Sequence, residues 1–179
     1  MHYEVGNFVS RIEAHSIQGT EIKIPSIQSK YVHLMFRRYA GCPICNLHLR
    51  TLVRDRHYVT NLGVRQIVVV ASEKEAVGEH MGALPFEFIA DPERKLYDKF
   101  SVETSPTAWM HPSAMLQVAQ GLITKPTIPS MRASEGATIL PAEFILGPSG
   151  KVLAAKYGKH AGDQWSVDEI VKHVASPRA

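Results

Sequence analysis

Two cysteines, the only ones in the 179-residue chain, lie three positions apart in the stretch Gly41-Cys42-Pro43-Ile44-Cys45. Cysteines at positions i and i+3 can close a small disulfide ring without moving the rest of the chain. Pro43 suits the first position of a helix, because the N–H that proline lacks has no intrahelical partner there. The spacing therefore predicts a dithiol at the start of a helix that can alternate between reduced and disulfide-bonded states.

Cys42 is expected to cap this helix. Its sulfur would lie beside free backbone N–H groups and the positive end of the helix dipole, which favour a thiolate. The thiolate is the nucleophilic form of cysteine. Arg37 and Arg38, a few residues earlier, are candidates for tuning the pKa of Cys42, the alternative being a solvated strand end. These arguments favour Cys42 over Cys45 as the attacking thiolate.

The same residues allow a second interpretation, in which the chain binds a metal. Cys42, Cys45 and His48 could contribute to one site, with His160 as a remote ligand. A structural zinc site needs four ligands, which two cysteines and scattered histidines supply poorly. A copper-binding or partner-binding module without turnover is therefore the alternative to an enzyme, and two inert core cysteines are the third interpretation. The enzyme interpretation requires neither a metal nor another cofactor.

The composition is that of a globular domain. Hydrophobic residues make up 45% of the chain and charged residues 21%, and the formal net charge is +3. Because the basic residues are scattered, nucleic-acid binding is not expected. The N-terminus lacks the apolar core of a signal peptide, and no stretch approaches 18 apolar residues, so we expect a cytoplasmic protein without membrane spans. In that compartment a close cysteine pair is more often redox-active or metal-binding than structural.

Hydrophobic patterning predicts alternating strands and helices over most of the chain. The expected strands cover residues 31–36, 66–71, 84–90, 140–146 and 151–157, and the expected helices follow Pro43, Ser72, Pro92 and Ser166. Two of the helix starts, Ser72-x-x-Glu75 and Ser166-x-x-Glu169, have capping-box spacing. The alternation predicts the α/β class, with a mixed central β-sheet that ends in a hairpin.

Two segments fit this alternation less well. Residues 1–30 are interpreted as an N-terminal extension of short strands or a hairpin. Residues 103–139 are rich in Pro, Ser and Gly toward their end and are interpreted as an insertion before the late hairpin that covers part of the molecule. The whole chain, residues 1–179, is expected to form one domain.

Taken in order, three stretches resemble the peroxiredoxin-like (AhpC/TSA-type) family of the thioredoxin-fold superfamily. They are the strand–GCPIC–helix unit, residues 90–102 (ADPERKLYDKFSV) and residues 140–158 (LPAEFILGPSGKVLAAKYG). The resemblance implies a thioredoxin-like fold and a thiol-dependent oxidoreductase that reduces hydroperoxides or disulfides. It further implies a thiol reductant such as thioredoxin or glutathione, and it makes a homodimer plausible.

The resemblance also implies roles for residues outside the cysteine pair. Pro141 would follow a cis peptide bond and lie against the cysteines, leaving the Leu140 backbone free to meet a substrate. With Gly41 and Pro43, these two residues would form the substrate groove. A peroxiredoxin-like alignment favours Cys45 as the attacking cysteine, with Cys42 resolving.

The chain departs from the family pattern around its cysteines. Peroxiredoxins carry Pro-x-x-x-Thr-x-x-Cys before the attacking cysteine. With Cys45 in that place, the Thr position holds Cys42 and the Pro position holds Arg38; with Cys42 there instead, the two positions hold Tyr39 and Met35. Neither register preserves the motif. The arginine often found before the late strand is also missing, and Arg132 is the candidate to replace it. Dithiol–disulfide exchange is therefore expected more firmly than peroxide binding.

Overall fold

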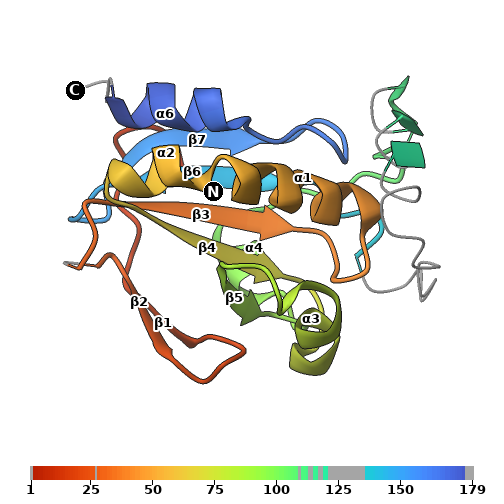
Figure 1. Ribbon diagram of the computed structural model, residues 1–179, viewed down its shortest axis with the longest axis horizontal. Helices are drawn as coiled ribbons and strands as arrows, with labels where there is room; N and C mark the ends of the chain where they lie inside the picture. Colours follow the sequence, from red (N-terminus) through yellow and green to blue (C-terminus); the bar gives the residue numbers. More distant parts are fainter. Residues whose placement is uncertain are drawn as a thin grey trace.

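The computed structural model of the protein describes residues 2–26, 28–108, 110–112, 115–116, 119–120 and 136–175. The strands are β1 (Ile12–His15), β2 (Glu21–Ile24), β3 (Tyr31–Arg37), β4 (Val64–Val70), β5 (Glu87–Ala90), β6 (Ala142–Leu146) and β7 (Val152–Tyr157). The helices are α1 (Pro43–Arg54), α2 (Arg56–Asn61), α3 (Lys74–Met81), α4 (Lys95–Lys99) and α6 (Val167–Ala175) (Figure 1). Arg132 and most of the Pro/Ser/Gly-rich stretch lie outside the described residues.

Five of the strands form one mixed sheet in the order β5-β4-β3-β6-β7. Strands β3, β4 and β5 are parallel, whereas β6 runs antiparallel to both β3 and β7. The α/β fold with a mixed central sheet and a late hairpin, expected from the sequence, is thus confirmed. Because β3 is the central strand, the loop that follows it and carries the cysteines lies at the end of the middle strand of the sheet.

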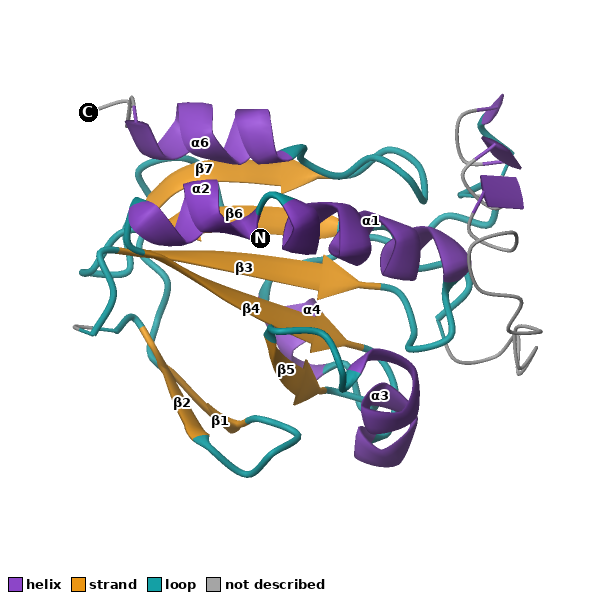
Figure 2. Cartoon of the chain, in the orientation of Figure 1, coloured by secondary structure: helices purple, strands orange, loops and turns teal. Residues whose placement is uncertain are grey.

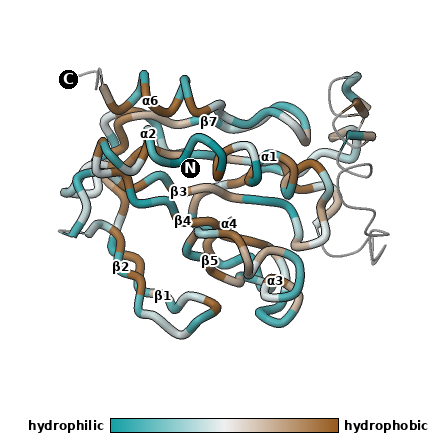
Figure 3. The backbone as a smooth tube through the Cα atoms, viewed as in Figure 1, coloured by the Kyte–Doolittle hydropathy of each residue, from teal (hydrophilic) through white to brown (hydrophobic). Residues whose placement is uncertain are grey.

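Helices and a hairpin cover the two faces of this sheet. Buried residues of α1, α2, α3 and α6 form one hydrophobic cluster, while α4 and the β1–β2 hairpin contribute to the cluster on the other face. Figure 2 shows α1, α2 and α6 on one side of the sheet, with α4 behind it. Helix α6 alternates between brown and teal along its turns in Figure 3, as expected for a helix with one buried face.

The alternation of side chains along β3 decides what faces α1. Val32, Leu34 and Phe36 belong to the cluster on the α4 side, whereas Met35 belongs to the cluster on the α1 side. His33 and Arg37 share the face of Met35, because residues two apart in a strand point the same way. The face of β3 below α1 therefore carries a buried histidine and a buried arginine beside the apolar side chains of the α1 cluster.

Two helix starts differ from the sequence-based expectation. Helix α3 begins at Lys74 with Glu73 as its cap, because the Ser72 hydroxyl instead accepts a hydrogen bond from the Ala40 N–H at 3.1 Å. Helix α4 begins at Lys95, after Arg94 in a left-handed conformation (φ 60°). Asp91 still satisfies this helix start, since its carboxylate accepts the N–H groups of the first two helical residues at 3.1 and 2.8 Å.

The segment 103–139 is closed at its base. Thr104 and Ile139 form an isolated antiparallel bridge. The Ser105 N–H donates to the Thr138 carbonyl at 2.7 Å, and the Leu140 N–H donates to the Glu103 carbonyl at 2.9 Å. In Figure 1 the described turns of this segment lie near the end of the molecule where α1 begins. The base of the segment therefore lies on the side of the fold that carries the cysteine loop.

The N-terminal residues pack onto the rest of the fold. Ile12, Ile22 and Ile24 are buried in the cluster on the α4 side, and β1 and β2 form the antiparallel hairpin that the sequence suggested. The Val9 N–H donates to the Gly150 carbonyl at 2.9 Å. None of the described helices has both the length and the apolar character that a membrane crossing would require.

Candidate functional site

The two cysteines lie together at the start of α1. Cys42 is the N-cap, Pro43 occupies the first turn, and the Cys45 N–H donates to the Cys42 sulfur at 3.3 Å. The Sγ atoms of Cys42 and Cys45 are 2.7 Å apart and share a hydrogen bond. Both are free thiols, and both residues are fully buried. The dithiol at a helix start, expected from the spacing, is present.

The loop before α1 is held in place by polar contacts that local sequence patterns did not reveal. The Cys42 N–H donates to the Tyr39 carbonyl at 3.1 Å. The Asn46 amide nitrogen donates to the carbonyls of Ala40 and Cys42 at 2.8 and 3.0 Å. Together with the Ser72 hydroxyl on the Ala40 N–H, these bonds fix the entry into the helix. The position of the Cys42 sulfur is thereby set by backbone groups on both sides of it.

The two thiols differ in acidity. Burial alone would raise the pKa of Cys45, but the hydrogen bond with Cys42, the Arg38 charge and the Arg38 backbone N–H outweigh burial and lower the pKa to about 6. Burial and the same hydrogen bond raise the pKa of Cys42 well above its usual value. With Cys45 as the thiolate, the Cys42 S–H is the donor between the sulfurs. These directions favour Cys45 as the thiolate, whereas the helix-cap argument favoured Cys42.

Arg37 and Arg38 are fully buried, so the interpretation of a solvated strand end is wrong. The Arg38 side chain donates a hydrogen bond to the Ala137 carbonyl. The neighbouring Gly136 has φ +146°, and a Cβ atom there would lie 2.8 Å from the Arg38 carbonyl oxygen. The returning end of segment 103–139 therefore packs directly on the residue whose charge and backbone acidify Cys45.

A second charged group lies below α1 and was missed from the sequence. Glu143, on β6, accepts hydrogen bonds from Arg37 at 3.0 Å and from His33 at 2.8 Å. Its Oε1 atom also accepts the Trp165 N–H at 3.1 Å. All three side chains, those of Glu143, Arg37 and His33, are buried. A single polar residue inside each of the apolar runs YVHLMF and PAEFIL was the signal that could have found this group.

His48 joins this group to α1. Its Nδ1 atom accepts from Arg37 Nη2 at 3.3 Å, and its Nε2–H donates to the Trp165 carbonyl at 2.8 Å. Burial and the Arg37 charge lower the pKa of His48 to about 4. Because both ring nitrogens are engaged, neither points free toward the cysteines.

The grouping of ligands gives no support to the metal-binding alternative. Within the part of the chain that the structure describes, no three His, Cys, Asp or Glu side chains are placed so that they could hold a metal ion. His160, considered as a remote ligand, stacks on His111 with ring centroids 4.1 Å apart.

The groove expected around Pro141 differs in its backbone. Among the described residues, the cis peptide bond is the one between Ile24 and Pro25. The bond between Leu140 and Pro141 is trans, so the expectation of a cis bond there is wrong. The Leu140 N–H is already bound by the Glu103 carbonyl, and the Pro141 carbonyl accepts the Gly158 N–H at 2.8 Å. The base of segment 103–139 thus occupies the Leu140 N–H, a backbone group that was expected to be free for a substrate. Gly41 and Pro43 are half-buried beside the cysteines.

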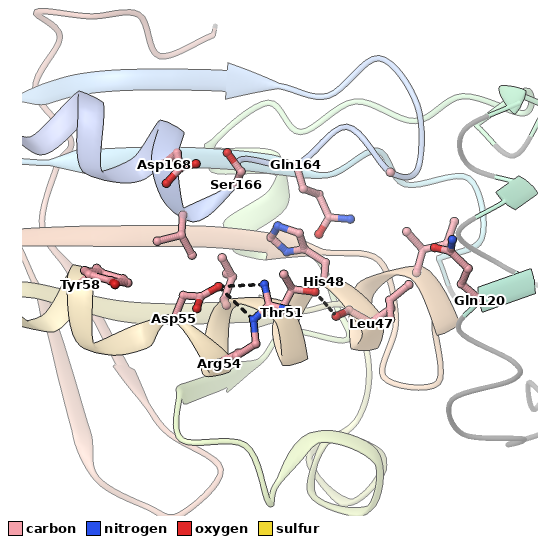
Figure 4. Close-up of a pocket in the computed structure, with 14 residues that line it drawn as sticks. Leu47, His48, Thr51, Arg54, Asp55, Tyr58, Gln120, Gln164, Ser166 and Asp168 are labelled. Atoms are coloured by element: carbon pink, nitrogen blue, oxygen red, sulfur yellow. Dashed lines mark hydrogen bonds and ion pairs between the residues drawn. The ribbon is translucent and has the colours of Figure 1, made fainter.

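A cavity lies on another flank of α1. It has a volume of about 430 Å³ and is bounded by α1, α2 and residues 162–168, with His48, Thr51, Tyr58 and Gln164 among its lining (Figure 4). Neither cysteine and none of the four residues of the expected groove is among its lining residues. His48 is the residue that both lines this cavity and contacts the buried charged group.

Known proteins resemble the chain over nearly all of its length. The model of the AhpC/TSA family matches residues 5–155. No curated protein matches the chain.

Among solved structures, the peroxidoxin BcpB from Mycobacterium tuberculosis has a TM-score of 0.72 at 13% identity, covering 99% of this chain and 100% of that one. A mutant of peroxiredoxin 6 of Arenicola marina has a TM-score of 0.66 at 21% identity, covering 97% and 73%. The reduced 2-Cys peroxiredoxin of Plasmodium vivax has a TM-score of 0.67 at 14% identity, covering 96% and 80%. These likenesses confirm the thioredoxin-like fold.

Proposed function

Because the chain belongs to the AhpC/TSA family and is therefore a thiol-dependent oxidoreductase, we propose that it reduces hydroperoxides with Cys45 as the attacking thiolate and Cys42 as the resolving thiol. The observation that carries this assignment is the 2.7 Å contact between two sulfurs of opposite pKa shift. At neutral pH such a pair holds one thiolate and one thiol side by side. That is the protonation state from which peroxide reduction followed by disulfide closure can start.

The first step is attack on the peroxide. The Cys45 thiolate donates an electron pair to one peroxide oxygen, and the O–O bond breaks. The leaving alkoxide, or hydroxide if the substrate is hydrogen peroxide, takes up a proton. Cys45 becomes a sulfenic acid, and the peroxide is reduced to an alcohol or water.

The second step closes the disulfide. Cys42 loses its proton and attacks the Cys45 sulfur, and the sulfenic oxygen leaves with a proton as water. The two sulfurs are adjacent at the start of α1, so the disulfide, with an S–S distance of about 2.05 Å, can form without movement of the helix. Two thiol equivalents then restore the dithiol by exchange. Glutathione would supply them as two small molecules, whereas thioredoxin, a protein dithiol, would require the disulfide to become exposed after oxidation.

Burial of the pair favours a small substrate. Neither cysteine has exposed surface, so a protein disulfide could not reach either sulfur in this conformation. A hydroperoxide is a few atoms across and needs a much smaller opening. This favours peroxide over the protein-disulfide substrate as the oxidant of the reduced pair, although the sequence alone made dithiol–disulfide exchange the firmer expectation.

Stopped-flow oxidation by hydrogen peroxide, with thiol counting and intact mass, tests the proposal. Wild-type protein should lose two thiols and about two hydrogens in mass. Cys42→Ser should stop at an oxidised Cys45 and lose steady-state turnover, whereas Cys45→Ser should lose the fast reaction altogether. Fast oxidation of Cys45→Ser at Cys42 would overturn the assignment of roles. Slow oxidation of the wild type, with rapid reduction of oxidised glutathione, would overturn the peroxide substrate.

A further inference from the structure

The buried group below α1 is organised by the register of two strands. In the antiparallel pairing of β3 with β6, Glu143 lies opposite Met35. It is therefore midway between His33 and Arg37, which are two residues on either side of Met35 and on the same face. One carboxylate oxygen accepts from His33 and the other from Arg37. Glu143 is the anion between these two side chains.

The hydrogen bonds around this carboxylate fix the protonation of its neighbours. Gln66 donates its amide N–H to His33 Nδ1 at 3.4 Å, so His33 Nε2 carries the proton that is donated to Glu143. Arg37 donates to His48 Nδ1, so His48 Nε2 carries the proton donated to Trp165. The charged pair at the centre of this arrangement is Arg37 with Glu143, whose Nη2 and Oε1 atoms are 3.0 Å apart.

This group reaches the region of Cys45. The Arg37 guanidinium touches His48, which lies one helical turn after Cys45 on α1. The other titratable and charged groups facing Cys45 are Cys42, Arg38 and Tyr39 before and at the helix start, and Tyr97 on α4. Among these groups, Glu143 carries the carboxylate, and it forms an ion pair with Arg37 near the Cys45 thiolate.

We propose that Glu143 is a positioning residue for the redox site: it holds Arg37 against α1 and offsets its charge, and so limits how acidic Cys45 becomes. The inference rests on the proposed role of Cys45 as the attacking thiolate. Burial by itself would raise the pKa of Glu143, but the Arg37 charge and the His33 hydrogen bond hold that pKa well below its usual range. The carboxylate therefore stays charged wherever Cys45 titrates.

Limiting the acidity of Cys45 has a consequence for its reactivity. A thiolate of lower pKa is present at lower pH, but it is also a weaker nucleophile. An uncompensated Arg37 would increase the thiolate fraction in acid and slow each thiolate. Glu143 thus keeps the pKa of Cys45 closer to neutral pH, where an attacking thiol reacts fastest.

The substitution Glu143→Gln removes the negative charge of the side chain and keeps its shape. The new amide oxygen can still accept from Arg37 and from the Trp165 N–H. Its amide nitrogen would face His33, which can adopt the other tautomer. Gln66 can then reverse its own amide, whose oxygen has no hydrogen-bond partner in the wild type. The substitution therefore removes the negative charge and leaves a route to satisfy each hydrogen bond.

The measurement is the rate of Cys45 alkylation by iodoacetamide from pH 4 to 9, located by peptide mass spectrometry. Glu143→Gln should lower the pKa of Cys45 by about one unit. It should also lower the plateau rate at high pH about threefold and raise the rate at pH 5 about twofold. Glu87→Gln breaks a carboxylate–arginine pair with Arg65 on the β4–β5 edge (2.7 Å) and should leave the profile unchanged.

A profile of Glu143→Gln that coincides with the wild type, or that moves toward the pKa of a free thiol, would overturn the inference. A wild type in which Cys42, not Cys45, is the acidic thiol would instead overturn the proposed function.

If Glu143→Gln does not fold, Arg37→Met with Glu143→Leu removes both charges, a replacement that buried ion pairs often tolerate. Arg37→Met alone should raise the pKa of Cys45, and the double variant should return it toward the wild-type value. A double variant no closer to the wild type than Arg37→Met would contradict the inference.

Discussion

The side chain of Arg38 donates a hydrogen bond to the backbone carbonyl of Ala137, which ties the returning end of segment 103–139 to the residue that acidifies Cys45. Arg38 is fully buried and also supplies a backbone N–H to the Cys45 sulfur. Arg38 thus couples the returning end of segment 103–139 to the reactivity of the Cys45 thiolate.

Replacing Arg38 should therefore change chemistry as well as stability. Arg38→Met removes a positive charge next to Cys45, so the pKa of Cys45 should rise by about one unit or more. At pH 6 the thiolate fraction should fall about fivefold. Because a thiolate of higher pKa is a better nucleophile, the rate of oxidation by hydrogen peroxide at this pH should fall by about twofold overall. Arg54→Met, which removes an exposed arginine paired with Asp55, is the matched control and should react at the wild-type rate. An Arg38→Met variant with the wild-type pH profile would show that the charge does not act on Cys45.

Gly136 offers a second test of the contact between segment 103–139 and Arg38. Gly136→Ala would place a Cβ atom 2.8 Å from the Arg38 carbonyl at φ +146°, so it should lower the unfolding free energy by about 1–3 kcal/mol. Gly78→Ala, inside α3 with no heavy atom within 4 Å of the new Cβ, should instead stabilise by about 0.5–1 kcal/mol. Urea denaturation measures both. Equal midpoints for the two variants would contradict the close approach at Gly136.

His48 makes the stability of the fold depend on pH. Burial and the Arg37 charge lower its folded pKa from 6.5 to about 4, so the folded state binds fewer protons than the unfolded state between these values. The stabilisation is fully present above pH 6.5 and is lost as the pH falls toward 4, by about 1–3 kcal/mol. His48→Gln should flatten this part of the curve of unfolding free energy against pH. A slope that His48→Gln leaves intact would assign the effect to another group.

Ser72 and Ser166 provide a matched pair of serine-to-alanine changes. Ser72→Ala leaves the buried Ala40 N–H unpaired beside the cysteine loop, so it should destabilise by about 1–3 kcal/mol and change the rate of Cys45 alkylation. Ser166→Ala removes the cap of α6, whose hydroxyl accepts the Glu169 N–H at 3.3 Å, and should cost about 1 kcal/mol. Alkylation of Cys45 should be unaffected by the second change. If both variants alkylate alike, Ser72 has no influence on the redox site.

Local patterns in the sequence predicted most of the fold. The apolar runs of β3, β4 and β6, and the capping box of Ser166 with Glu169, lie where they were expected, because each depends on neighbours within a few residues. Ser72 does not cap α3, because its hydroxyl accepts a hydrogen bond from the N–H of Ala40, which is 32 residues away in the sequence. A competition between a local cap and a distant backbone N–H is decided by the packing of strands, which a local pattern does not contain.

The cysteine pair was visible from spacing, but the assignment of the thiolate was not. Helix-cap arguments favoured Cys42, whereas in the structure the charge and backbone N–H of Arg38 act on Cys45. The Glu143 group depends on the β3–β6 register, which joins residues more than 100 positions apart. Pro141 was expected to be cis through resemblance to a family, and the backbone of Glu103 instead pairs with the residue before it.

The bridge between Thr104 and Ile139 has an entropic consequence for the chain between its two ends. Since these residues are already joined, the intervening residues form a loop whose closure cost grows only with the logarithm of its length. Halving or doubling that length would change the stability of the fold by only about 0.6 kcal/mol. The number of residues between the two ends can therefore be varied, in nature or by design, without redesigning the sheet that carries the thiols.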